Sequence, residues 1–387
     1  MWMNDNDLVE WISQNAGPSL KLRLFTNGLY SGSAQEIDEI IIKLMELKEV
    51  NTALNYFDAF ETVPIENKSI EHLIHYYKDS CIDQFFPGVL DLGFRGGIKV
   101  FDEKMQFVAN TFYGLLSADY DFCYNYLCMM HRFFFLSGYT TEKINNAMLQ
   151  RLNVLHSAAT EKIFDIYQDG SKLPKPPIQW ENRGIIKDEL NPFSIDPIKP
   201  LPTIYDISAL AYFQKYNMDP QIKNKIEDVA EYILDPEFQK LPENYGLIWN
   251  KNKRIYHACG WAPKLPLYKG NEVSNEYAIL SYLHMMSNFD VALKSEWFSD
   301  GLNYLEQFRT EKGTYLFPKE YLWRKILCPS GTSDYLGINI NCHAAYLNEA
   351  NMKLKRNERE LLIRGLVSTL NVIEIRKKNH IKHLEYN

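Results

Sequence analysis

Apolar residues recur at intervals of three and four positions over most of this chain, and this helical period constrains its fold more than any other feature. Ser33 and Glu36 have the spacing of a capping box that begins a helix. Asp219 and Pro220 form a typical N-cap and first-turn pair before another periodic run. After Ser33, five aliphatic side chains fall on one helical face, at Ile37, Ile40, Ile41, Leu44 and Leu47.

The chain is therefore predicted to be all-α, with its helices paired into hairpins around a shared core. Besides the two runs above, helices are predicted at residues 6–15, 18–29, 50–60, 69–86, 100–116, 120–137, 141–167, 204–216, 275–289, 292–309, 339–353 and 356–376. Strand patterns are scarce. The best pair, residues 246–249 and 254–257 around four polar residues, predicts a small β-hairpin.

One segment breaks the helical pattern. Seven prolines lie between residues 170 and 202, a density that forbids regular helix and predicts a long proline-rich loop. The loop contains Trp180 and several aliphatic residues, so we expect it to pack on the body of the protein. It divides the chain into an N-terminal helical half at 1–168, a connecting segment at 169–203 and a C-terminal helical half at 204–387, which together form one closed architecture.

Charge and composition exclude several classes of protein. Forty-nine acidic against 42 basic residues give a net charge of −7, and no long basic run is present, so no nucleic-acid partner is expected. The most apolar stretch, 107–138, contains acidic and basic residues, so stable membrane insertion is not expected. No secretory signal precedes the first helix, and six scattered cysteines suit a reducing compartment. A cytoplasmic protein is predicted.

Aromatic residues are abundant, with 25 Tyr, 21 Phe and 7 Trp. They line a ligand cavity or fill an aromatic-rich core, and the sequence leaves both open. If a cavity is present, its predicted walls are Tyr205 and the tryptophans that follow helices, Trp180, Trp249, Trp261 and Trp323. No Walker, dinucleotide-binding, Gly-x-Ser-x-Gly or His-Glu-x-x-His motif occurs.

Four stretches carry a resemblance to a known family: 17–23 (Gly-Pro-Ser-Leu-Lys-Leu-Arg), 200–210, the Gly-Leu-Ile-Trp turn at 246–249 and the Gly-Thr-Tyr-Leu-Phe-Pro-Lys-Glu run at 313–320. With its helix pairs and aromatic content, the chain resembles the α/α-toroid proteins of the terpenoid cyclase and protein prenyltransferase type. The resemblance implies a toroid of helical hairpins around a central cavity. The nearest counterpart of the Asp-x-Asp-Asp acid of such cyclases is Asp119-Tyr120-Asp121-Phe122, which has one carboxylate fewer.

Three aspartates are candidates for acid chemistry. Asp119 and Asp121 lie in an otherwise apolar segment, where burial and mutual repulsion would raise one pKa. Asp206 follows the proline-rich segment at the start of a predicted helix. The alternative for each is a structural one, because aspartate at a helix start usually caps the helix.

Cys259, Cys342 and His343 suggest zinc, since two thiolates and an imidazole would leave an open coordination position of the catalytic kind. The pattern is similar to that of lanthionine cyclases, toroids in which Cys-Gly and Cys-His-Gly stretches hold the metal; here Cys259 precedes Gly260, whereas His343 precedes Ala344. The alternative is that these are buried structural cysteines.

Three functions remain open after these observations. The first is a toroid that binds an apolar or natural-product-like small molecule in an aromatic-lined cavity, with enzymatic activity of the cyclase or transferase type. The second is a zinc-dependent cyclase or transferase that uses Cys259, Cys342 and His343. The third is a non-catalytic helical interaction scaffold, which needs no polar cluster in a cavity.

Overall fold

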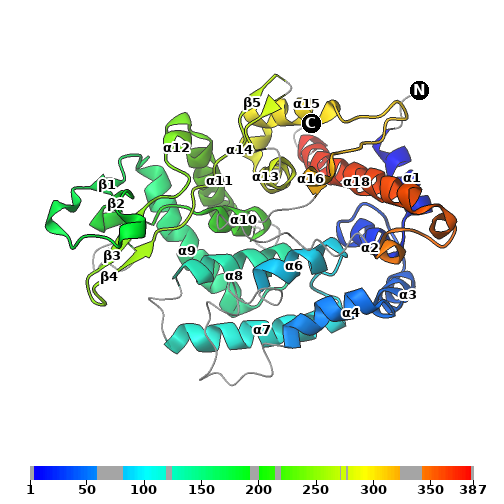
Figure 1. Ribbon diagram of the computed structural model, residues 1–387, viewed down its shortest axis with the longest axis horizontal. Coiled ribbons are helices and arrows are strands. Elements are labelled where there is room, and N and C mark those ends of the chain that lie inside the picture. The colour runs from blue at the N-terminus through cyan, green and yellow to red at the C-terminus, as the bar shows by residue number, and fades with distance from the viewer. Residues whose placement is uncertain are drawn as a thin grey trace.

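The computed structural model describes residues 4–58, 82–118, 124–191, 200–213, 219–270, 272–275, 278–322 and 342–384. Over these residues the chain is predominantly helical, which confirms the predicted all-α class (Figure 1). The principal helices are α1 (Asp5–Asn15), α2 (Pro18–Thr26), α3 (Ala34–Met45), α4 (Lys48–Asn55), α6 (Ile82–Asp91), α7 (Lys99–Ala118), α8 (Tyr124–Ser137), α9 (Glu142–Thr160), α10 (Ile204–Phe213), α11 (Pro220–Leu234), α13 (Ile279–Met286), α15 (Glu296–Glu306) and α18 (Arg356–Leu384). Shorter helices are α12 (Pro236–Lys240), α14 (Asp290–Leu293), α16 (Lys319–Leu322) and α17 (His343–Tyr346).

Local capping sets the helix starts. The Ser33 side chain accepts from the Glu36 N–H, and the Glu36 side chain accepts from the Ser33 N–H, which confirms the predicted capping box of α3. Asp219 caps α11, with Pro220 at its first position, also as predicted. The predicted helix at 292–309 is wrong in one respect: Ser295 accepts from the Phe298 N–H and begins α15, so α14 is a separate short helix.

Helices pack mostly against partners that are not their immediate neighbours in sequence. α8 packs on α10, α9 packs on α11, and α13 contacts both α10 and α18. The N-terminal helix α1 lies along α18, and Ala16 forms an antiparallel bridge with Leu347 (Figure 1). A single hydrophobic core therefore includes residues from both predicted halves of the chain, such as Leu20 and Ile373.

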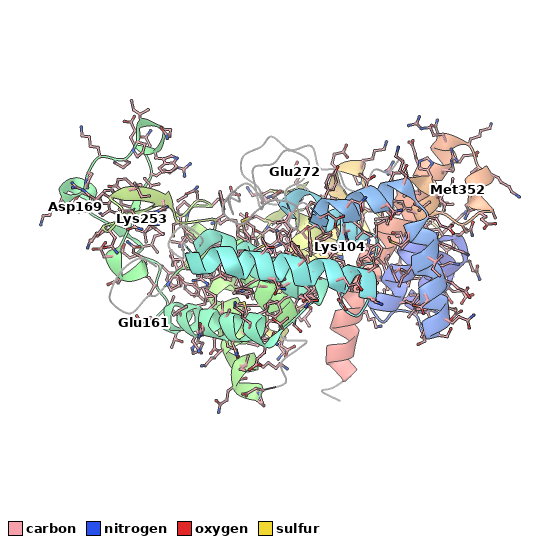
Figure 2. All side chains as sticks on the ribbon, turned by 90° about the horizontal axis from the view of Figure 1, so that it is seen from below. Lys104, Glu161, Asp169, Lys253, Glu272 and Met352 are labelled. Carbon is pink, nitrogen blue, oxygen red and sulfur yellow. The ribbon has the colours of Figure 1, made fainter. Side chains whose placement is uncertain are left out.

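Part of the proline-rich segment folds into a small sheet at one end of the molecule. Its four strands, in spatial order, are β1 (Tyr167–Gln168), β2 (Ile185–Ile186), β3 (Leu247–Asn250) and β4 (Ile255–Ala258) (Figures 1 and 2). β3 and β4 pair antiparallel within one residue of the predicted strand positions, while β2 pairs parallel with β3. The proline-rich segment thus supplies one strand, β2. This strand pairs with β1, which directly precedes the segment, and with β3, which lies about sixty residues later in the chain. A separate pair is formed by β5 (Tyr268–Lys269) and β6 (Glu272–Val273).

The aromatic residues of the described chain mainly fill the core. The largest fully buried side chains there are tyrosines and phenylalanines. Phe86 and Phe133 are typical, with ring centroids 4.8 Å apart, and Phe57 packs edge-on against Phe86. Within the described residues, no helix is both long enough and apolar enough to span a bilayer.

Candidate functional site

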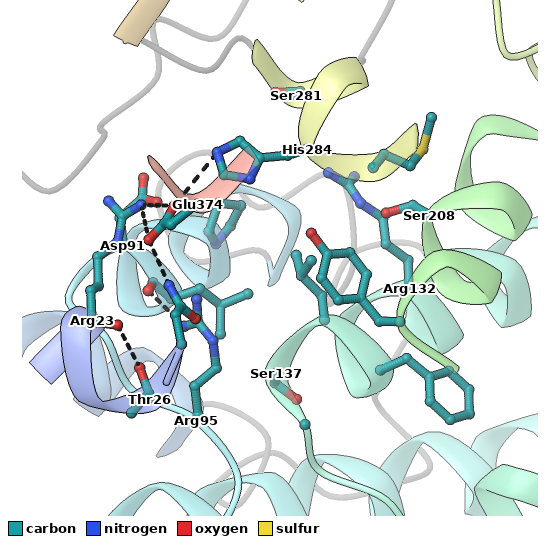
Figure 3. Close-up of a pocket in the computed structure, with 18 of the residues that line it drawn as sticks. Arg23, Thr26, Asp91, Arg95, Arg132, Ser137, Ser208, Ser281, His284 and Glu374 are labelled. Carbon is teal, nitrogen blue, oxygen red and sulfur yellow. Dashed lines mark hydrogen bonds and ion pairs between the residues drawn. The ribbon is translucent and has the colours of Figure 1, made fainter. Parts of the chain in front are cut away.

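Six elements converge on a pocket of about 550 Å³, a size typical of small-molecule sites. Its walls come from α2, α6 and the loop after it, α8, α10, α13 and α18. Figure 3 shows a charged wall that carries Arg23, Arg95 and Glu374, and an opposite wall that carries Arg132 and Ser208. His284 reaches in from α13.

A buried ion pair anchors the charged wall. Gly17 is the N-cap of α2, and its N–H donates to the Tyr346 carbonyl. One turn and a half later, α2 places Arg23 next to α18. The Nη2 of Arg23 lies 3.0 and 2.8 Å from the two carboxylate oxygens of Glu374. Burial alone would lower the pKa of Arg23, but Glu374 and the nearby Asp91 outweigh it and raise that pKa.

Glu374 is also the neighbour of His284. The Nε2 of His284 lies 2.9 Å from Oδ1 of Asn371 and 3.5 Å from a carboxylate oxygen of Glu374. Asn27 donates to the other oxygen of that carboxylate at 2.6 Å. The side chains of Arg23, Asn27 and His284 thus surround one carboxylate at the edge of the pocket (Figure 3).

Arg95 is held by the loop after α6. Gly96 donates its N–H to the Ser137 carbonyl at 2.7 Å, and a Cβ at Gly96 would lie 2.3 Å from the Gly138 oxygen, so glycine is needed for this close approach. The Nη1 of Arg95 donates to the carbonyls of Leu90 and Phe94. Within the described chain, Arg95 has no carboxylate partner within ion-pair distance. Burial, and then the charge of Arg23, lower the pKa of Arg95 to about 10.

The pocket as a whole has more cationic than anionic side chains, and part of its remaining lining is apolar. Among the described residues that line it, the cationic side chains are Arg23, Arg95, Arg132 and Lys377, and the carboxylates are Asp91 and Glu374. Arg132 lies over the Tyr205 ring, 5.9 Å from its centroid. The apolar lining includes Leu90, Phe135, Leu136, Tyr212 and Met285. Such a pocket suits a molecule with an anionic group and an apolar body.

The predicted acid Asp206 lies outside this pocket and is fully engaged in structural contacts. Its carboxylate receives two hydrogen bonds of 2.8 Å from Arg151 on α9, and it completes a capping box with Thr203 at the start of α10. Burial would raise the pKa of Asp206, but Arg151 and then Thr203 reverse that effect and lower it. A carboxyl group with a lowered pKa is a poor proton donor, so the structural alternative describes Asp206.

His131 is buried close to that ion pair. It is 1% exposed, and neither ring nitrogen has a hydrogen-bond partner among the residues that the structure describes. Burial lowers its pKa to about 4; the charge of Asp206 opposes this shift and that of Arg151 adds to it.

The structure does not bring the predicted zinc ligands together. No group of three or more His, Cys, Asp or Glu side chains able to hold a metal occurs in the described chain, which includes all three of these residues. Cys342 donates to Glu49 at 3.6 Å, whereas the N–H of Cys259 bonds to Gly246 beside the small sheet. Burial raises the pKa of the Cys259 thiol to about 12 and that of Cys342 to about 11, which disfavours the thiolate that zinc needs.

The predicted aromatic walls are spread over two places. Trp180 and Trp249 belong to the small cluster around the sheet, where Trp249 packs on Tyr256 at a centroid distance of 4.7 Å. Tyr205 and Trp261 meet edge-on at the start of α10. None of these four lines the pocket. Asp119, Asp121 and Trp323 lie outside the described residues.

Sequence reasoning did not select the residues that line the pocket. Arg23 stands in the Gly-Pro-Ser-Leu-Lys-Leu-Arg stretch that carried part of the family resemblance, and Arg132 stands in the most apolar part of the chain. A charged residue inside an apolar run is the one signal that could have pointed to this site. Glu374, between Ile373 and Ile375, carries the same signal, whereas Arg95 lies in a glycine-rich segment that gives none.

The chain matches no family model, and no curated protein or solved structure is significantly similar to it. What the site does must therefore be argued from its own chemistry. The toroid resemblance and the cyclase or transferase activity that it implies stay predictions.

Proposed function

We propose that this protein binds a small organic anion with an apolar body in the pocket between α2, α6, α8, α10, α13 and α18. Arg95 carries the proposal: it lines the pocket, and its hydrogen bonds within the described chain go only to backbone carbonyls. A half-buried cation near a second cation is electrostatically costly, and its lowered pKa reflects that cost. An anion in the pocket would offset it.

The geometry of Arg95 also indicates how the anion binds. Since Nη1 is occupied by the carbonyls of Leu90 and Phe94, the Nε and Nη2 groups remain for a ligand. This edge of a guanidinium group forms paired hydrogen bonds with carboxylate or phosphate oxygens. The apolar body of the ligand would then lie against Phe135, Leu136 and Met285. The proposal thus keeps the small-molecule ligand predicted from the sequence. It adds that this ligand carries an anionic group as well as an apolar body.

Isothermal titration calorimetry with three matched probes tests the proposal. The probes are 3-phenylpropionate, 3-phenylpropyl phosphate and the neutral 3-phenylpropionamide. At least one anion should bind about tenfold or more tightly than the amide, because a hydrogen bond to a charged group contributes about 1.5–3 kcal/mol. The two anions separate carboxylate recognition from phosphate recognition.

Arg95→Met should reduce the affinity for the anion to that for the amide. Arg254→Met is the matched control, because it removes the same charge from an exposed position outside the pocket. If the wild-type protein binds acid and amide equally, or binds neither, the proposal is wrong. The interaction-scaffold hypothesis would then be favoured.

A further inference from the structure

Two cationic side chains of the pocket have no carboxylate partner within ion-pair distance in the described chain. Arg95 is one, and it donates only to two backbone carbonyls there. Lys377 is the other, and its ammonium group donates to the Gly28 carbonyl. Arg23, by contrast, pairs with Glu374. Arg95 and Lys377 are therefore the side chains best placed to pair with the charges of a ligand.

Lys377 lies on the face of α18 that borders the pocket. It follows Glu374 by three residues, and residues three apart on a helix lie on the same face, about one turn from each other. Both side chains line the pocket, and so does Gly28, which accepts from the ammonium group. An ammonium group has three N–H donors, so two donors of Lys377 remain for a ligand after the bond to Gly28.

The charges of the whole pocket agree with this pairing. Apart from His284, its described lining has four cationic side chains and two carboxylates, an excess of two positive charges. Burial lowers the pKa of Arg95 to about 10 and also lowers the pKa of Lys377, so both cations are partly removed from water. A ligand with one negative charge would leave half of the excess charge in place, whereas a dianion would balance it.

The size of the pocket allows one small ligand to reach both cations. A sphere with the pocket's volume of about 550 Å³ is about 10 Å across, which is the length of a phenyl ring with a short acidic side chain. The two cations approach the pocket from different elements, since Arg95 lies in the loop after α6 and Lys377 lies on α18.

We propose that the ligand of this pocket is a dianion, with one negative charge held by Arg95 and the second by Lys377. This inference rests on the proposed function, since the ligand must first bind as an anion. It narrows the ligand class to molecules whose apolar body carries a phosphate monoester or two carboxylates. These two kinds of molecule share the double charge and differ in how far apart the charges lie.

Isothermal titration calorimetry at pH 8 with two matched pairs of probes tests the double charge. The first pair is 3-phenylpropyl phosphate, a dianion because its second pKa is near 6, and its methyl ester, a monoanion. The second pair is 2-benzylsuccinate, a dianion, and 3-phenylpropionate, which lacks only the carboxymethyl group. In at least one pair the dianion should bind about tenfold or more tightly, the usual effect of a hydrogen bond between charged groups.

Substitutions of Lys377 test which side chain holds the second charge. Lys377→Met should make the dianion and monoanion of the preferred pair bind equally, while 3-phenylpropionate keeps its wild-type affinity. Lys377→Arg should retain the preference, because it keeps the positive charge. Lys43→Met is the matched control and should change nothing, because Lys43 is an exposed lysine on α3 that does not line the pocket.

The outcomes separate this inference from the proposed function. If the wild-type protein binds none of the anions, the proposed function fails. If it binds the anions but neither dianion more tightly than its monoanion, the double charge is wrong while anion binding stands. A preference that persists in Lys377→Met overturns the role of Lys377. A preference within the phosphate pair alone identifies a phosphate monoester, and one within the carboxylate pair alone identifies a dicarboxylate.

Discussion

Acid sensitivity should depend strongly on one buried side chain, His131. It is 1% exposed, has no hydrogen-bond partner in the described chain, and has a pKa of about 4 instead of 6.5. The informative substitution is His131→Leu, which removes the titrating ring and replaces it with an apolar side chain of similar size. Asp206 and Arg151 act on the His131 ring through their charges. Phe135 packs edge-on against it, with the two ring centroids 6.4 Å apart.

The sign of the effect follows from proton binding. Between pH 6.5 and pH 4, the unfolded chain protonates this histidine but the folded chain does not, so the free energy of unfolding falls as the pH falls. The full difference in pKa corresponds to about 3 kcal/mol. About 2 kcal/mol of this is lost between pH 7.5 and pH 5, and the loss from this group is complete just below pH 4.

Urea unfolding at pH 7.5 and pH 5 measures the effect. The wild-type protein should lose about 2 kcal/mol more than His131→Leu over this interval. At pH 7.5 the variant should be at least as stable as the wild type, because two buried polar atoms without partners have been removed. Equal losses in the two proteins would refute the reasoning, since acid sensitivity would then come from other groups.

Three further substitutions test other parts of the fold. Asp206→Asn should reduce the free energy of unfolding by about 3–5 kcal/mol, because it leaves the buried Arg151 without its charge partner; a loss below about 1 kcal/mol in urea unfolding would contradict this. Gly246→Ala should weaken the small sheet, since Gly246 has φ +117° and a Cβ would lie 2.3 Å from the Gly184 oxygen; faster amide exchange in β3 is the readout, and unchanged exchange would count against it. Ser33→Ala should reduce stability by about 1 kcal/mol equally at pH 7.5 and pH 5, because the serine hydroxyl that it removes does not titrate; it also serves as the control for His131→Leu.

Local sequence determined where many of the helices begin. A cap is formed by residues two or three positions apart, so Ser33 before α3 and Asp219 before α11 could be recognised without knowledge of the fold. Helix ends were harder to predict. The helix predicted at 141–167 ends at Thr160. Two residues later Lys162 has φ +48°, a left-handed conformation that is uncommon for lysine and that the local sequence does not predict.

The proline-rich segment shows the limit of the same reasoning. Over the described residues 170–191 and 200–203 its proline density correctly excluded α-helix, but the strand β2 within it exists because Ile185 pairs with Leu247, sixty-two residues later. Likewise, Asp206 could be placed at a helix start from sequence, whereas its partner Arg151 lies fifty-five residues earlier. In both cases the feature set by neighbouring residues could be predicted from the sequence. The partner far away in the chain could not.

The candidate site was decided by tertiary structure alone. Arg23 and Glu374 are 351 residues apart, and His284 reaches the same carboxylate from a third helix. Hydrophobic periodicity reports which face of a helix is buried, because it reflects the geometry of one segment. It does not report which buried faces meet, and the charge balance of the pocket depends on that meeting. The sequence therefore determined a helical protein rich in aromatic residues, and only the packing of six distant elements placed those aromatics in a core and created the pocket.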